Sequence, residues 1–224
     1  MIFDPLYIIM LVPVLLLSGW ASMLTRSRFK KYSQVRAYSG YTGARAAQRM
    51  LEANGVYDVK IERSRGMLSD HYDPRTKIIR LSEEVHDGAS LAAVGVACHE
   101  AGHALQHAQS YAALGLRSAL VPVAQIGSNL APFIFIVGLI AQIPVVMQVA
   151  ILLLGAMFLF TLVTLPVEYN ASARAKAHMV AAGIVSPNQE ADAGKVLNAA
   201  FMTYLAAAVA ALAQLLYYVL RSRR

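Results

Sequence analysis

Long stretches without a charged residue alternate with polar segments along this chain of 224 residues. The uncharged stretches are 5–25, 118–167 and 196–220, which hold 21, 50 and 25 residues. A helix needs about 20 apolar residues to cross a bilayer, so the middle stretch is long enough for two such helices. Its Ala-Gln-Ile-Pro sequence at 141–144 is a natural turn between them. The pattern predicts about four transmembrane helices, at 6–23, 120–140, 145–165 and 197–220.

The first polar segment has the pattern of a helix, several strands and a second helix. Thr42 can cap a short helix that ends at Ala53. Ser90 opens a longer helix rich in small residues, which runs to about Gln109. Three runs between these helices are typical of short strands separated by turns, namely 56–63, 67–72 and 77–81. We expect a small antiparallel sheet beside the second helix.

The second polar segment is short and predicts one helix. Pro166 suits the first turn of a helix, and Gly183 followed by Pro187 suits its end. The predicted organisation of the whole chain is an N-terminal transmembrane anchor (1–25), a polar segment (26–117), a transmembrane hairpin (118–167), a polar helix (168–195) and a C-terminal transmembrane helix with a basic tail (196–224).

Composition narrows the possible functions. The chain carries 20 Lys and Arg against 13 Asp and Glu, which gives a net charge of +7. Its basic residues do not interleave with aromatic residues in a stacking pattern, so nucleic-acid binding is not expected. The single cysteine, Cys98, excludes an internal disulfide and a metal site built from four thiolates.

The basic residues also predict an orientation in the membrane. Five of them follow the first apolar stretch, at Arg26, Arg28, Lys30, Lys31 and Arg36. Such residues favour the cytoplasmic side, so we expect both polar segments, 26–117 and 168–195, to be cytoplasmic. The N-terminus would then lie outside the cell on an uncleaved anchor. The basic tail would also lie outside if the last helix spans.

The candidate chemistry is concentrated in the sequence Cys-His-Glu-Ala-Gly-His-Ala-Leu at 98–105. His99 and His103 are four residues apart on one predicted helix, so their side chains lie one turn apart on one face. Two imidazoles placed in this way can bind one Zn²⁺ ion. Glu100 is rotated away from the histidines by one residue, where it can take a proton from a water on the metal. This HExxH pattern predicts a zinc site.

A catalytic zinc site has three protein ligands and a water, so a third ligand is needed. His107 lies about 12 Å along the helix from His99 and cannot share its metal. His71 lies in a predicted strand and could reach the site only through the fold. We favour Glu168, which opens the helix after the hairpin on the same side of the membrane. Small residues on that helix would permit a close approach to Gly102, at Ala171, Ser172 and Ala175. The alternative is that Glu168 only marks the membrane interface.

Four segments resemble the YugP-type neutral zinc metallopeptidases of bacteria. They are Asp-His-Tyr-Asp-Pro-Arg at 70–75, Arg-Leu-Ser at 80–82, His-Glu-Ala-Gly-His at 99–103 and Pro-Val-Glu-Tyr-Asn-Ala-Ser at 166–172. The resemblance covers nearly the whole chain and implies a zinc peptidase of the bacterial inner membrane. More distantly, the chain is similar to the HtpX and CAAX-prenyl-protease gluzincins, which also place a Glu ligand after membrane segments. Those proteins usually carry Asp four residues past that Glu, where this chain has Ser172.

These observations predict a mainly helical membrane protein with a cytoplasmic α+β zincin-like metallopeptidase domain. We expect it to hydrolyse peptide bonds of membrane-associated proteins or peptides near the cytoplasmic face of the bilayer. The strand 77–81 could pair with an extended substrate, and His178 or Arg174 could stabilise the oxyanion.

Two alternative functions stay open. One is an intramembrane site-2-type metalloprotease, although its usual Leu-Asp-Gly membrane motif is absent because the chain contains no Leu-Asp pair. The other is a non-catalytic membrane adaptor with a structural zinc. Glu100 argues against the adaptor, since a structural site does not need a base.

Overall fold

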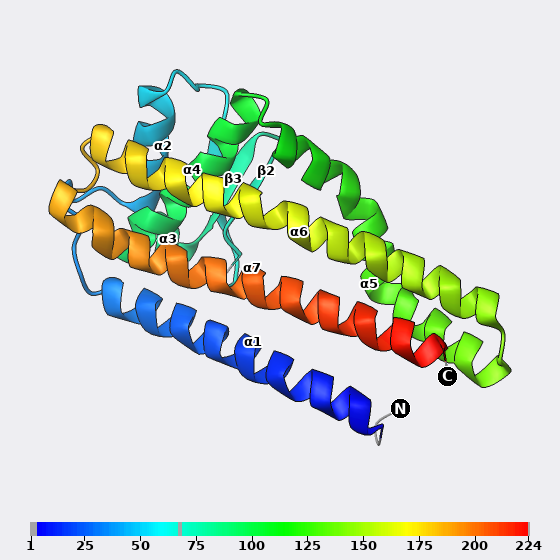
Figure 1. The fold of residues 1–224 in the computed structure, drawn as a ribbon. Helices are drawn as coiled ribbons and strands as arrows, with labels where there is room; N and C mark the ends of the chain where they lie inside the picture. The colour runs from blue at the N-terminus through cyan, green and yellow to red at the C-terminus, as the bar shows by residue number, and fades with distance from the viewer. Residues whose placement is uncertain (1–3, 67–68, 224) are drawn as a thin grey trace. The chain divides into compact units, whose positions relative to one another are not determined.

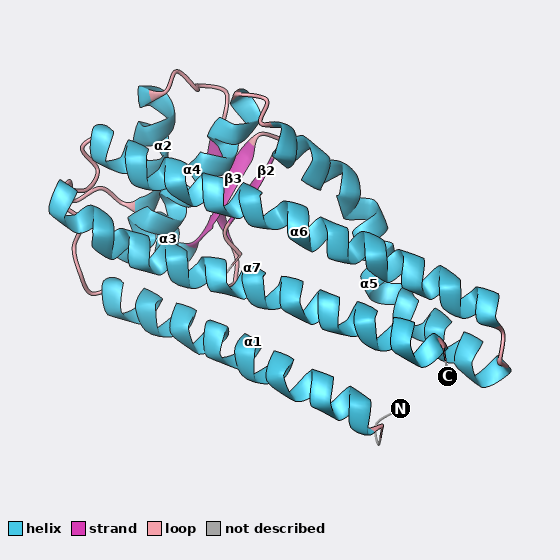
Figure 2. Cartoon of the chain, in the orientation of Figure 1, coloured by secondary structure: helices cyan, strands magenta, loops and turns pink. Residues whose placement is uncertain are grey.

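The computed structural model describes residues 4–66 and 69–223 and is mostly helical (Figures 1 and 2). Its elements, in chain order, are α1 (Pro5–Tyr32), α2 (Gly43–Ala53), β1 (Lys60–Ser64), β2 (His71–Asp73), β3 (Ile78–Ser82), α3 (Glu83–Asp87), α4 (Leu91–Ala108), α5 (Ala112–Ala141), α6 (Pro144–Ala181) and α7 (Pro187–Ser222). The chain forms two compact units. The first contains Met1–Ala21, Gly115–Pro166 and Met202–Arg224, and the second contains Ser22–Leu114 and Val167–Phe201.

The first unit is formed by segments of apolar helices. Four helices of the described chain, α1, α5, α6 and α7, are long and apolar enough to cross a membrane. Many of their large apolar side chains are not covered by protein, for example Leu16 (70% exposed), Ile140 (78%) and Leu152 (74%). Exposing so many side chains of this kind to water would be costly, whereas hydrocarbon is a suitable environment. The predicted number of four candidate spans is confirmed.

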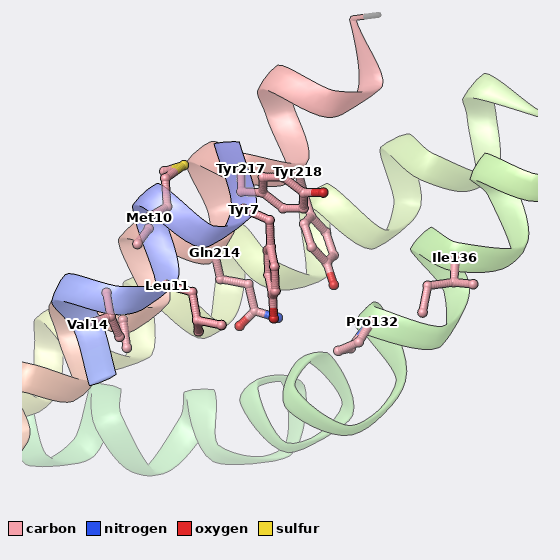
Figure 3. A pocket seen from close by; sticks show the side chains of 11 residues that line it. Tyr7, Met10, Leu11, Val14, Pro132, Ile136, Gln214, Tyr217 and Tyr218 are labelled. Carbon is pink, nitrogen blue, oxygen red and sulfur yellow. The ribbon is translucent and has the colours of Figure 1, made fainter. Parts of the chain in front are cut away.

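A cavity of about 440 Å³ lies within this first unit, among side chains of α1, α5 and α7 (Figure 3). Most of its lining is apolar, and polar atoms come from Gln214 and from the tyrosines at positions 7, 217 and 218. The Tyr7 and Tyr217 rings contact each other with centroids 5.1 Å apart. The cavity contains none of the candidate site residues, all of which belong to the second unit.

The second unit contains the sheet, whose strand order is β1-β3-β2. Strand β2 is antiparallel to β3, but β1 is parallel to it, so the expected antiparallel sheet is in fact mixed. The reason is topological. The strands alternate in direction along the chain, and β3 returns between the other two, where it meets β1 in the same direction. Residues 67 and 68 of the second predicted strand lie outside the described residues.

The sheet order also corrects the expected substrate strand. The predicted strand at 77–81 corresponds to β3, and both of its edges are already paired, with β1 and with β2. A central strand has no free backbone edge for a peptide. Any strand addition would therefore have to use an outer strand, β1 or β2.

Both predicted helix starts in this unit are confirmed by their caps. The Thr42 hydroxyl accepts a hydrogen bond from the Arg45 N–H at 3.3 Å, and the Ser90 hydroxyl accepts one from the Ala93 N–H at 3.2 Å. Such contacts satisfy backbone donors that a helix leaves unpaired at its start. Helix α4 is then anchored by a core that it shares with β3, formed by Ile79, Leu81, Leu91, Val94, Ala97 and Leu105.

Helix α6 differs from the expectation at Pro166. We expected a new helix to begin there, but α6 runs without interruption from Pro144 to Ala181, with Pro166 inside it. Proline removes one backbone hydrogen bond, and apolar helices that cross membranes tolerate this more often than soluble ones. The predicted end is confirmed, because α6 stops just before Gly183, which has a φ of +70°, and α7 begins at Pro187.

Helices α4 and α6 approach each other very closely at Gly102. A Cβ added at Gly102 would lie 2.5 Å from the carbonyl oxygen of Ala171, which is closer than atoms can pack. Ala171 and Ala175 are fully buried. The predicted contact between these small residues and the histidine helix is confirmed, and only glycine fits at position 102.

We predict opposite effects for alanine at two glycines of α4. Gly102→Ala should lower the free energy of unfolding by about 1–3 kcal/mol, because the added methyl group must displace the α6 backbone. At Gly95 an added Cβ would lie 3.8 Å from the Ala193 carbonyl oxygen, an ordinary contact. Gly95→Ala should be neutral or stabilise by up to about 1 kcal/mol, because alanine favours helix. Thermal unfolding in detergent measures both, and equal stabilities would contradict the close approach.

Candidate metal centre

His99 and His103 lie one turn apart on α4 and turn their rings toward each other. The ring centroids are 4.8 Å apart, and the ring planes are inclined by 83°. Both side chains are largely buried, with 15% and 9% of their surface exposed. The four-residue spacing therefore places two imidazoles in one enclosed position, as the sequence predicts.

Glu168 reaches the same position from α6. Its residue is only 1% exposed, and its Oε2 atom lies 3.2 Å from His99 Nε2 and 3.5 Å from His103 Nε2. One potential ligand atom from each of these three side chains lies within 4.8 Å of the other two. The close contact at Gly102 makes this convergence possible, because it brings the two helix backbones together beside His103.

The two distances to the Glu168 oxygen suit a zinc ion. Zinc bonds to imidazole nitrogen and carboxylate oxygen are about 2.0–2.2 Å long and tetrahedrally arranged, so neighbouring ligand atoms should be about 3.3–3.5 Å apart. The observed separations of 3.2 and 3.5 Å agree with this value. Two histidines and one glutamate also form a donor set that leaves a fourth position open, as catalytic zinc sites do.

The second nitrogen of each histidine also has a partner. Ser172 Oγ lies 3.1 Å from His99 Nδ1, and Gln106 Oε1 lies 3.0 Å from His103 Nδ1. Such contacts hold the rings so that Nε2 of each can bind a metal. Neither role was predicted from the sequence. Helical spacing could have suggested them, because Gln106 follows His103 by three residues and Ser172 follows Glu168 by four.

Glu100 is the neighbour of His99 and is also buried, with 8% of its surface exposed. Burial raises the pKa of Glu100 to about 7, and the negative charges of Glu168 and Asp70 act in the same direction, whereas His99 opposes them. A carboxyl group that is buried next to candidate metal ligands is a plausible proton acceptor. The role of a general base stays a prediction for Glu100.

The two other candidate ligands, His107 and His71, lie elsewhere. His107 Nδ1 contacts the Tyr72 hydroxyl at 2.8 Å, and His71 Nδ1 lies 2.8 Å from the Ser69 carbonyl oxygen. Among the described residues, the candidate cluster contains His99, His103 and Glu168 and neither of these. The preference for Glu168 therefore has geometric support.

The residues expected to stabilise an oxyanion are less well placed. His178 follows Glu168 by ten residues on α6, a rise of about 15 Å along the helix axis. Arg174 uses its side chain to bind Asn170 Oδ1, at 2.7 Å, and Gln109 Oε1. The oxyanion role stays a prediction for His178, and the Arg174 contacts indicate a structural use of its guanidinium.

Cys98 precedes the first histidine but does not face a polar environment. Its side chain is fully buried in the core of the second unit. Burial raises the pKa of the Cys98 thiol to about 12, so the reactive thiolate form is suppressed. This agrees with a packing residue rather than a redox or metal-binding cysteine.

Comparison with known proteins identifies related sequences. A model of the family described as "Putative neutral zinc metallopeptidase" matches residues 7–223. The chain is 47% identical over 215 residues to "Putative membrane protease YugP" of Bacillus subtilis (strain 168), and the alignment covers 96% of each chain. No solved structure matches the chain. The matched region includes the three candidate ligands and the four apolar helices.

Proposed function

Because the chain belongs to the neutral zinc metallopeptidase family, we propose that it is a zinc-dependent endopeptidase embedded in the bacterial cell membrane. The observation that carries this proposal is the convergence of His99, His103 and Glu168 within 4.8 Å. Glu100 lies beside this cluster as a buried carboxyl group. The proposed substrates are proteins or peptides close to the membrane, because the relative is named a membrane protease and the chain has four apolar helices.

The residues of the site have separable roles in this proposal. When bound by His99, His103 and Glu168, zinc would polarise the scissile carbonyl group and a water molecule. Glu100 would accept a proton from the attacking water and deliver it to the leaving amine. Ser172 and Gln106 would hold the histidine rings in position through their Nδ1 atoms. Burial of the cluster would keep bulk water away from the reacting groups.

The alternative functions have less support. An intramembrane protease would carry its histidines on a spanning helix, but α4 is not among the four candidate spans. A structural zinc in an adaptor would not require a buried carboxyl group next to the ligands.

Strand β2 packs against α4 and is an outer strand, so it is the proposed place for an extended peptide to pair.

We predict that Glu100→Gln separates zinc binding from catalysis. The substitution keeps the shape of the side chain but removes the proton acceptor, so peptidase activity should fall by roughly 10²–10⁴-fold. Zinc content should not change, because Glu100 is not in the ligand set. Zinc analysis and cleavage of a fluorescently labelled unfolded protein test the two parts. Full activity would overturn the proposed base, and loss of zinc would overturn the ligand set.

We further propose that both polar segments face the cytoplasm, since basic residues crowd the end of the first apolar stretch. A membrane-impermeant maleimide added to intact cells should not label Tyr57→Cys or Asn188→Cys, which are exposed positions of these segments. It should label Ile143→Cys in the α5–α6 turn, which serves as the control for access. Labelling at Tyr57→Cys or Asn188→Cys would contradict the proposed cytoplasmic location of that segment. Labelling at Ser222→Cys tests whether α7 spans.

A further inference from the structure

We propose that Gln106 is a positioning residue that sets the tautomer of His103 and links α4 to α6. This proposal rests on the proposed function, because it concerns the same zinc site. Gln106 follows His103 by three residues on α4 and is completely buried, with 0% of its surface exposed. A buried amide must find partners for its oxygen and for both of its N–H groups, or it destabilises the fold.

Gln106 has these partners on two helices. Its Oε1 atom lies 3.0 Å from His103 Nδ1, on its own helix. Its Nε2 atom donates to the Val167 carbonyl oxygen at 2.8 Å and to Asn170 Oδ1 at 2.9 Å, both on α6. The side chain thus contacts one candidate ligand directly and, on α6, the residue before Glu168 and the residue two positions after it.

The orientation of the Gln106 amide is determined by its two partners on α6, which can only accept hydrogen bonds. The Val167 carbonyl oxygen can only accept a hydrogen bond. Asn170 Oδ1 also receives a hydrogen bond from Arg174 Nε at 2.7 Å, and a guanidinium group can only donate. The atoms of α6 that face Gln106 are therefore both acceptors. Gln106 must turn its nitrogen toward α6 and its oxygen toward His103.

This direction fixes the proton on the His103 ring. An amide oxygen can only accept, so His103 Nδ1 must carry the hydrogen. In a neutral imidazole the lone pair is then on Nε2, the atom that lies 3.5 Å from Glu168 Oε2. Gln106 therefore prepares His103 to bind a metal through Nε2. With the amide reversed, the Gln106 oxygen would face two acceptors on α6, the Val167 carbonyl oxygen and Asn170 Oδ1.

Ser172 cannot give the same control over His99. A hydroxyl group can either donate or accept, so its contact with His99 Nδ1 is compatible with both tautomers. The group that can only accept, Gln106 Oε1, therefore faces the second histidine and not the first.

Three variants of the full-length protein in detergent test the proposal, with the zinc dissociation constant measured by competition with a chromophoric chelator. Gln106→Met has a similar volume but no polar atoms, and it should weaken zinc binding roughly 10–100-fold. Gln106→Glu, with its buried carboxyl group protonated, keeps an oxygen that accepts from His103 Nδ1 and gains an O–H that can donate to the Val167 carbonyl oxygen, so its affinity should stay near that of the wild type. Gln109→Met is the control, because this exposed amide binds Arg174 but does not contact His103.

The results separate a positioning role from a packing role. Both replacement side chains are close to glutamine in volume, so if Gln106 acted through its volume alone, zinc affinity would stay near that of the wild type in both variants. Equal losses, or wild-type affinity in Gln106→Met, would overturn the proposal. If Gln106→Met does not fold, the Gln106→Glu protein decides alone, and its failure to bind zinc when folded counts against the proposal. Absence of zinc binding in the wild type would instead refute the proposed function.

Discussion

The close contact between α4 and α6 is the constraint on which the candidate site depends. Because Gly102 has no Cβ, the Ala171 carbonyl oxygen can lie directly against the α4 backbone. At this separation Glu168 on one helix and His103 on the other come within 3.5 Å. A wider separation would leave a two-histidine site without its carboxylate. Gln106 reinforces the same contact from inside, because its amide binds both His103 and the α6 backbone.

Local sequence signals predicted the parts of this arrangement that depend on neighbouring residues. The four-residue spacing of His99 and His103 is enough to place both rings on one helix face. Thr42 and Ser90 mark helix starts because their hydroxyl groups satisfy backbone donors within the next turn. The uncharged stretches reveal the apolar helices by length alone. Even the approach of α6 to Gly102 could be expected from the small residues on both helices.

The features that depend on distant parts of the chain could not be predicted in the same way. The sheet is mixed because β3 inserts between β1 and β2, and no local pattern specifies that order. Pro166 is a signal for the first turn of a helix and also occurs inside long apolar helices, so its position alone could not decide between them. The role of Gln106 requires knowledge that Val167, Asn170 and His103 surround one amide. A glutamine in a helical sequence does not by itself indicate such a positioning role.

The proposed function requires His99, His103 and Glu168 to bind one zinc ion. The most direct test is a structure of the zinc-loaded protein with anomalous scattering recorded at the zinc edge. We expect a single zinc site with Nε2 of both histidines and a Glu168 oxygen at about 2.0–2.2 Å from the metal. A zinc ion held by other side chains, or a Glu168 side chain directed away from the metal, would contradict it.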